Sequence, residues 1–434
     1  MPATRLIRGI SRGHLLAMHV NGMVGAGVLG LPATAFGMSG AYSLVAWVVA
    51  ATLVAGIALC LAEVSSRYDK SGGPYLIALD AFGPTVGFVT GWLIWVSRVL
   101  AFATVCGLLV EYVGLFADGA ARGAGRVAFV SSVVAALTCL LLSGIRQTAW
   151  VSTLLTVVKV ALLVVFAIGG LLLAQAPVVI VGTAPSFASF TATISVLLFA
   201  FFGFENGPIA TGETVDPRRN LPFAILASVA IVSVLYVVVQ YACIVTLPGL
   251  AESRRPLADA ATLMLGSVGG RIVAGGAIVV MLGTLLPQMI GTTRTLMAMG
   301  EQGQLPSQFS VLHEKRRVPV LATLLCAVAA LAATLLSSFT TAITITVATR
   351  VFTYVILCLA LPVLRTRRAG APFHLRAGIV IALMSAVLSL SLITTAALRD
   401  VVATAIVAVS GWIVWRVVRE RWQMVEDRLE RYPS

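Results

Sequence analysis

Long apolar runs recur along the whole chain, separated by short polar segments. Each run is long enough for a helix to cross a bilayer, which takes about 17 to 25 residues. The pattern therefore predicts an all-α integral membrane protein, folded as a single transmembrane domain over residues 1–434. We place about twelve transmembrane helices, at residues 13–36, 41–66, 84–115, 126–143, 149–174, 186–212, 221–247, 268–300, 319–337, 341–364, 375–394 and 400–418.

The first run contains a segment that interrupts a helix, Asn21–Pro32, with four glycines within nine residues. Each glycine costs about 1 kcal/mol relative to alanine inside a helix. Backbone groups freed in the hydrocarbon must face a cavity or find partners in the protein. We therefore expect an unwound helix beside a polar cavity that can hold a small zwitterion, as in transporters. The alternatives are a flexible hinge and a close helix–helix contact.

A second interruption lies in the sixth run, where Gly203, Glu205, Gly207 and Pro208 occur close together. Five runs precede it, so the two interruptions occupy corresponding positions of two five-helix halves. This arrangement predicts a 5+5 inverted repeat with discontinuous helices 1 and 6 and a binding site between the halves. The expected parts are a first repeat at about 13–174, a second at about 186–364, helices 11–12 at about 375–418 and a cytoplasmic tail at 419–434.

Composition and charge agree with a membrane protein. Hydrophobic residues make up 59% of the chain and charged residues 11%, against about 25% charged in soluble domains. With the N-terminus inside, twenty basic residues fall in inner loops and tails, and six fall outside: Arg122, Arg126, Arg254, Arg255, Arg271 and Arg399. The positive-inside rule then predicts that both termini are cytoplasmic. The net charge of +13 reports this topology and contact with lipid headgroups, and no nucleic-acid partner is expected. The run Arg416–Arg431 is expected to form a short helix at the inner interface.

Four stretches, in order, resemble motifs of one family: Gly22–Pro32, Ala62–Trp92, Phe202–Pro222 and Thr292–Pro306. On these motifs the chain resembles the amino acid–polyamine–organocation (APC) superfamily, specifically a bacterial-type amino acid permease, from about residue 12 to 365. The resemblance implies secondary active transport of an amino acid or a closely related amine across the cell inner membrane. It also implies alternating access, in which helices 1, 2, 6 and 7 rock against the rest, and we expect a monomer or homodimer.

The first interruption is expected to bind the substrate carboxylate. After the break, a new helix N-terminus presents free N–H groups and the positive end of its dipole to the cavity. The residues that offer these amides are Gly25, Ala26 and Gly27.

The second interruption is expected to bind the ammonium group through carbonyls at the end of a half-helix. These carbonyls belong to Phe199, Phe202 and Gly203, and Met23 adds one from the first interruption. Phe199, Phe202 and Phe204 are also candidates for walls and gates of the cavity. For each single ring, packing against a neighbouring helix explains the residue equally well.

Lys159 lies deep in the fifth run, where a charged side chain is by default a functional hypothesis. It resembles a lysine of proton-coupled APC members, whose ammonium stands where sodium binds in sodium-coupled relatives. A lysine shielded from water can release and regain a proton during a transport cycle. The alternative is a permanently charged lysine that holds helix-one carbonyls. We therefore expect a proton as the coupling ion, with no cofactor and no metal.

Three more ionisable residues lie deep in the runs: Arg98, Glu205 and Arg350. Arg98 either receives a substrate carboxylate or pairs with Glu205, and we favour the pair. Glu205 is otherwise a proton acceptor or a partner of the substrate ammonium. Arg350 either belongs to an extracellular gate or extends into a vestibule. Gln288, beside a proline kink of the eighth run, is a further pocket candidate.

Glu213 and Arg294 are expected to form ion pairs of an inner gate, with a solvated or topology-setting role as the alternative. The preferred function is proton-coupled symport, with amino acid/product antiport or export as the alternative. A channel or a substrate-sensing receptor remains a remote alternative because fold does not determine function. An enzyme is disfavoured because no nucleophile–base pair is evident and the histidines lack metal-ligand spacing. The histidines are His14, His19, His313 and His374.

Overall fold

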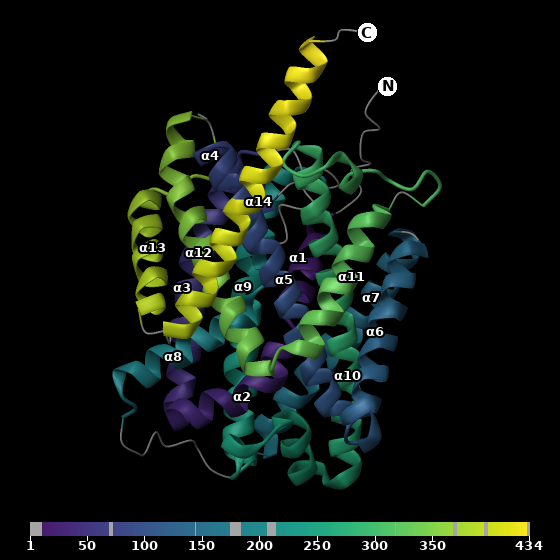
Figure 1. Ribbon diagram of the computed structural model, residues 1–434. Helices are drawn as coiled ribbons and strands as arrows, with labels where there is room; N and C mark the ends of the chain where they lie inside the picture. The colour runs from purple at the N-terminus through teal and green to yellow at the C-terminus, as the bar shows by residue number, and fades with distance from the viewer. Residues whose placement is uncertain are drawn as a thin grey trace.

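The computed structural model describes residues 11–68, 73–143, 145–173, 184–205, 214–316, 318–367, 371–394 and 398–431. These segments form a bundle of helices, most of which run roughly along one axis (Figure 1). The first seven are α1 (Arg12–Met23), α2 (Ala26–Ser39), α3 (Ser43–Ser65), α4 (Gly73–Phe82), α5 (Pro84–Val113), α6 (Gly123–Ser143) and α7 (Ile145–Leu173). The others are α8 (Phe187–Leu198), α9 (Pro217–Thr246), α10 (Pro256–Glu301), α11 (Val320–Leu336), α12 (Phe339–Arg367), α13 (Gly378–Thr394) and α14 (Leu398–Arg431).

The expected all-helical membrane architecture is confirmed at this level. Within the described residues, seven helical stretches are long and apolar enough to cross a membrane. They are Ala26–Ser65, Pro84–Val113, Gly123–Ser143, Pro217–Thr246, Pro256–Glu301, Thr341–Arg367 and Val401–Arg419. Four shorter apolar helices accompany them, at Val157–Leu172, Phe187–Phe201, Val320–Leu336 and Gly378–Leu392. The number of crossings therefore stays a prediction.

The first apolar run is interrupted where the glycines predicted it. Helix α1 ends at Met23, Val24 is extended with φ −70° and ψ 107°, and α2 begins at Ala26. The second interruption begins after α8, where a 3₁₀ turn, η3 (Phe199–Phe201), leads to an extended Phe202. Residues 206–213, which follow it, lie outside the described residues.

Three elements differ from the predicted helices. The connection expected as a loop between the second and third runs contains α4. Helix α10 begins at Pro256 instead of residue 268, and it carries a kink at Gly266, where φ is 75°. Helix α14 continues to Arg431, so the separate interfacial helix expected over Arg416–Arg431 is wrong. This stretch holds neither glycine nor proline, and its arginine, glutamate and leucine residues favour an uninterrupted helix. Figure 1 shows α14 projecting beyond the bundle at the end where α4 lies.

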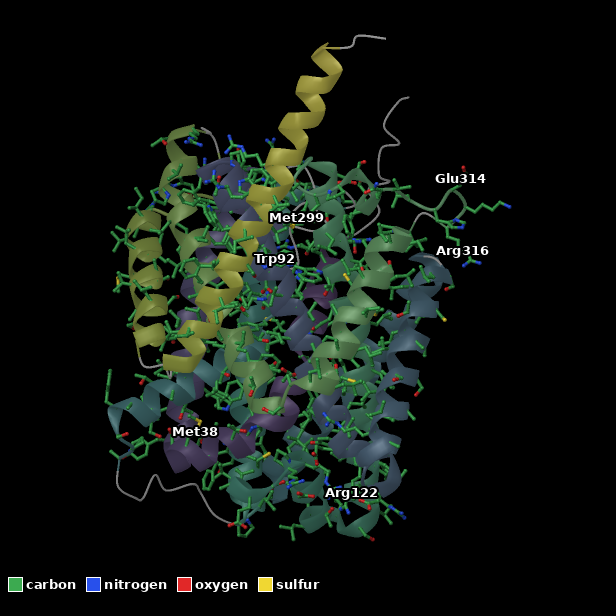
Figure 2. The ribbon with its side chains drawn as sticks, in the orientation of Figure 1. Met38, Trp92, Arg122, Met299, Glu314 and Arg316 are labelled. Atoms are coloured by element: carbon green, nitrogen blue, oxygen red, sulfur yellow. The ribbon has the colours of Figure 1, made fainter. Side chains whose placement is uncertain are left out.

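Helix α5 lies at the centre of the packing, with α10 and α12 against it, while α9 packs on α1 and α3. Helices α2 and α8 pack on each other at the end of the bundle opposite α4 (Figure 1). Figure 2 places Arg122 near the end of the molecule opposite α4 and Arg316 on a connection nearer the α4 end. This separation agrees with the assignment of their loops to opposite sides of the membrane.

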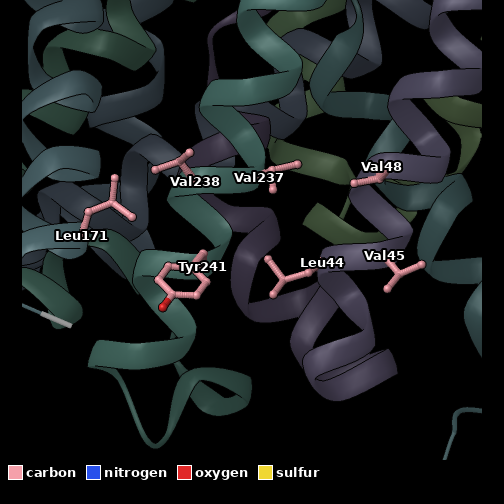
Figure 3. A pocket seen from close by; sticks show the side chains of 7 residues that line it. All are labelled: Leu44, Val45, Val48, Leu171, Val237, Val238 and Tyr241. Atoms are coloured by element: carbon pink, nitrogen blue, oxygen red, sulfur yellow. The ribbon is translucent and has the colours of Figure 1, made fainter. Parts of the chain in front are cut away.

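An apolar groove opens on the outer surface between α3, α7 and α9 (Figure 3). Its lining is aliphatic apart from Tyr241 and includes Leu44, Val48 and Val237. Such a surface suits a hydrocarbon environment, but it offers few polar partners to a zwitterion. The groove is therefore not the candidate site.

Glu63 ties three segments together at the α4 end of the bundle. Its side chain is fully buried and accepts hydrogen bonds from Arg67 Nη2 at 3.0 Å and from the amide of Leu375 at 2.9 Å. Arg365 of α12 donates through Nε at 2.8 Å and through Nη2 at 2.7 Å, one to each carboxylate oxygen. The cluster joins α3 to α12 and to the segment before α13. This is a structural role for the glutamate of the second family motif.

Glu63→Gln should lower the melting temperature of the detergent-solubilised protein by several degrees. Hydrogen bonds to charged groups contribute about 1.5–3 kcal/mol each, and the buried arginines would lose their counter-charge. The matched control is Glu111→Gln, which removes an exposed pair with Arg254 at 3.7 Å and should shift the melting temperature little. Equal shifts in the two variants would show that the cluster contributes no more than a surface pair.

Candidate functional site

The two interruptions cross each other in the interior. Gly203 has a φ of +123°, a conformation that side chains with a Cβ rarely adopt. A Cβ at this position would collide with the carbonyl of Gly22 and lie 2.9 Å from the amide nitrogen of Met23. Glycine at Gly203 therefore allows the backbones of the two broken helices to touch.

A cavity lies at this crossing. Its walls come from both interruptions and from α5, α10 and α12, and they include most of the residues predicted from the sequence. From the interruptions come Gly22, Met23, Gly25, Ala26, Gly27, Phe199, Phe202, Gly203 and Glu205. From the other helices come Arg98, Ala101, Val105, Thr284, Gln288 and Arg350.

The N-terminus of α2 opens onto this cavity. Gly25 is its N-cap residue and has no side chain to cap the first turn, so the amides of Ala26 and Gly27 lie at the lining. A helix N-terminus in this state attracts an anion through its free N–H groups and its dipole. The arrangement suits a carboxylate, as expected from the glycine-rich sequence.

Gly27 has a packing role that the sequence did not reveal. A Cβ on this residue would lie 2.5 Å from Cα and 2.7 Å from Cβ of Ala200, so α2 could not approach η3 as closely. At Gly25 a Cβ would instead meet the Thr284 side chain, with Cγ2 at 2.8 Å. A side chain can shift more readily than backbone, so the two glycines differ in tolerance.

Gly27→Ala should lower the melting temperature more than Gly25→Ala does. Overpacking of a tight interior costs about 1–3 kcal/mol, and only the Gly27 variant presses on backbone. Gly107→Ala is the control, because nothing lies within 4 Å of a Cβ at that position of α5. That variant should be neutral or slightly stabilised. A Gly27 variant as stable as the control would refute the close approach of α2 to η3.

Some of the carbonyl oxygens at the two interruptions already accept hydrogen bonds from the protein. The Tyr236 hydroxyl of α9 lies 2.8 Å from the carbonyl oxygen of Met23 and 2.9 Å from that of Ala200, and its single O–H is shared between these two acceptors. The Phe202 amide donates to the Phe199 carbonyl at 3.2 Å. Each carbonyl oxygen has a second lone pair, so the predicted role of these groups toward an ammonium stays a prediction.

Lys159 of α7 is fully buried against the first interruption. Its ammonium donates to the carbonyl oxygens of Asn21 and Val24, both at 2.6 Å, and lies 3.4 Å from the Thr284 hydroxyl. These are the helix-one carbonyls named in the structural alternative for this lysine, and the same contacts would also hold the segment in a coupling role. Its role in coupling stays a prediction.

The ion pair of Glu205 differs from the expected one. The carboxylate pairs with Arg350 of α12, and the expected pair with Arg98 is wrong. Arg350 is 4% exposed and lines the cavity, so the vestibule alternative does not describe its position, while its role in a gate stays a prediction. Arg98 lines the same cavity from α5. Both arginines lie on buried helix faces, and only the tertiary packing decides which guanidinium reaches the carboxylate.

Besides Lys159, two of the predicted residues that the structure describes, Phe204 and Arg294, lie outside the cavity lining. Phe204 is fully buried and packs on Tyr354, with ring centroids 5.4 Å apart, so it is a packing residue and forms no wall of the cavity. Arg294 is half-buried on α10 and is absent from the lining. Glu213 lies outside the described residues, so its pairing with Arg294 stays a prediction.

Several site residues escaped the sequence analysis although some carried a signal. Thr284 precedes Gln288 by one helical turn, and Ala101 and Val105 follow Arg98 at helical spacing. These three share the cavity-facing side of a helix with a residue already chosen. Tyr236 carried no comparable signal, because its contacts come from a helix distant in sequence.

Comparison with known proteins decides the family. Residues 10–417 match the family described as amino acid permease. The chain belongs to the amino acid permease family, within the APC superfamily. An uncharacterized transporter of Mycobacterium tuberculosis is 31% identical over 72% of this chain and 70% of its own length. The serine/threonine exchanger SteT of Bacillus subtilis is 27% identical over 71% of this chain and 72% of its own. The branched-chain amino acid permease BcaP of the same species is 27% identical over 71% and 70%.

The resemblance to this family that the four motifs indicated is thereby confirmed. Amino acid permeases are multi-pass membrane transporters, which agrees with the long apolar helices of this chain. The family is not a family of enzymes, so the cavity at the crossed interruptions is a candidate transport site.

Proposed function

We propose that this permease carries an amino acid by alternating access, with the substrate held at the crossed interruptions; free amides at the site favour a substrate with a carboxylate over an amine without one. The observation that carries the proposal is the uncapped N-terminus of α2, which faces the same cavity as the end of η3. The N-terminus of α2 offers amides for a carboxylate, and the end of η3 offers carbonyls for an ammonium. The relatives named for serine, threonine and branched-chain amino acids support a substrate of this class.

The proposed architecture has twelve crossings, with a 5+5 inverted repeat and two further helices. Both termini are cytoplasmic and the membrane is the inner membrane. In this scheme α1, α2, α3, α8 and α9 belong to the moving bundle. The contact of Gly203 with Gly22 supports the scheme, because it brings the interruptions of the two halves to one point.

The proposed driving force is a proton gradient acting through Lys159. The ammonium holds two carbonyls of the first interruption, so its deprotonation would release α7 from that segment. Exchange of one amino acid for another is the alternative, and a relative named as an exchanger favours it. Either mode uses the same cavity.

The binding site is tested by thermal-shift measurements on the purified protein. At least one amino acid should raise the melting temperature, whereas its methyl ester and its decarboxylated amine should not. The ester lacks the charge that α2 attracts, and the amine lacks the carboxylate altogether. Equal shifts by the amino acid and its ester would contradict recognition of the carboxylate.

A further inference from the structure

The carboxylate in the cavity wall is already committed to the protein. Among the described lining residues, Glu205 is the acidic one, and its side chain is 2% exposed. One oxygen pairs with Arg350. The other carboxylate oxygen accepts hydrogen bonds from the Gly203 amide at 3.0 Å and from the Tyr354 hydroxyl at 3.3 Å. The Glu205 carboxylate, which could otherwise bind a cationic side chain of the substrate, therefore already has partners within the protein.

We propose that the permease accepts amino acids with neutral or acidic side chains and excludes those with cationic side chains, and that Arg350 is the residue that sets this limit. The proposal rests on the transport function argued above and adds the substrate class. It concerns the side chain of the substrate, since the ammonium of its backbone is met by carbonyls at the interruptions.

Arg350 is fixed on more than one side. Its Nε donates to the Ser97 hydroxyl of α5 at 2.5 Å, and its guanidinium carbon lies 5.2 Å from the centroid of the Phe202 ring. A cationic side chain that displaced it from Glu205 would leave a buried guanidinium without its counter-charge. Removing one partner of a buried ion pair is strongly unfavourable. Exchange of partners therefore gives a cationic substrate no net advantage.

The charged groups in the cavity wall also disfavour a cationic side chain on the substrate. The described lining contains two guanidinium groups, on Arg98 and Arg350, and one carboxylate, on Glu205. A substrate amine or guanidinium would add a like charge in a medium that screens poorly. A neutral side chain adds none, and it can pack on Ala101 and Val105 of the same wall. An acidic side chain adds no positive charge either, so it does not meet this repulsion.

The test uses full-length protein and matched substrate pairs. Melting-temperature titrations compare serine with 2,3-diaminopropionate and norleucine with lysine, within a panel that includes the other common amino acids, glutamate and arginine among them. Every amino acid that binds well should carry a neutral or acidic side chain, and each cationic member should bind at least tenfold more weakly than its neutral partner. Lysine, arginine or diaminopropionate within tenfold of the best neutral amino acid would overturn the proposal. Failure of every amino acid to bind would instead contradict the transport function.

Variants test whether Arg350 causes the exclusion of cationic side chains. Arg350→Gln frees Glu205 and should improve binding of the cationic members at least tenfold relative to their neutral partners. The double variant Arg350→Gln/Glu205→Gln lacks the freed carboxylate and should lose this gain, whereas a merely structural role would give both variants the same preference. Arg122→Gln, which removes an exposed arginine far from the cavity, should leave the preference unchanged. No gain in a folded Arg350→Gln protein would overturn the role of Arg350. If that variant does not fold, the ratios measured on the wild-type protein and the double variant still decide the proposal.

Discussion

Lys159→Ala should abolish proton-driven uptake while leaving a folded, membrane-inserted protein. The wild-type ammonium donates two hydrogen bonds of 2.6 Å to carbonyls of the first interruption, and alanine offers no donor and no titratable group. Uptake of a bound amino acid into proteoliposomes should respond to an imposed inward pH gradient in the wild type and ignore it in the variant. Exchange of internal for external amino acid can persist, because the cavity wall is unchanged.

Lys315→Ala is the matched control for this experiment, since Lys315 is an exposed lysine in the connection before α11. It should keep the full response to the pH gradient. Wild-type uptake that requires sodium, or that continues when the pH gradient is collapsed, would assign Lys159 a structural role. The exchange mode would then replace symport.

Glu205 and Arg350 should show strong coupling in a double-mutant cycle. Removing either partner of a buried pair costs about 3–5 kcal/mol, because the remaining charge has lost its counter-charge. Glu205→Gln and Arg350→Gln should each lower the melting temperature markedly, and the double variant should be more stable than the sum of the two losses predicts.

The control cycle combines Glu205→Gln with Arg98→Gln. Arg98 shares the cavity but is not the ion-pair partner of Glu205, so these two effects should be closer to additive. Strict additivity in the Glu205–Arg350 cycle, with coupling in the Arg98 cycle, would restore the pairing first expected from the sequence.

The sequence predicts what depends on local backbone chemistry. Glycines at Gly22, Gly25 and Gly27 indicate a broken helix because their effect on the backbone is local, and the structure breaks the helix at Val24. The residues nearest the break can then be predicted to line the cavity. The same holds for the second interruption around Gly203, where glycine marks a backbone conformation that residues with a Cβ rarely adopt.

The sequence does not predict what depends on how helices rotate against each other. Arg98 and Arg350 are both arginines in apolar runs, and hydrophobic pattern alone does not tell which of them reaches Glu205. The contact of Gly27 with Ala200 likewise needs the packing of α2 on η3. Tyr236 joins the carbonyls of Met23 and Ala200 from a third helix, so no motif near the interruptions reveals it.

The central claim is that the cavity at the crossed interruptions carries an amino acid by alternating access. Counterflow tests it most directly. Proteoliposomes loaded with an unlabelled amino acid that stabilises the protein should accumulate the labelled form transiently, and the rate should saturate with external concentration. Gly203→Ala, which cannot keep the crossing intact, should show neither behaviour. Flux that rises linearly with concentration and does not respond to internal substrate would contradict a carrier and indicate a channel.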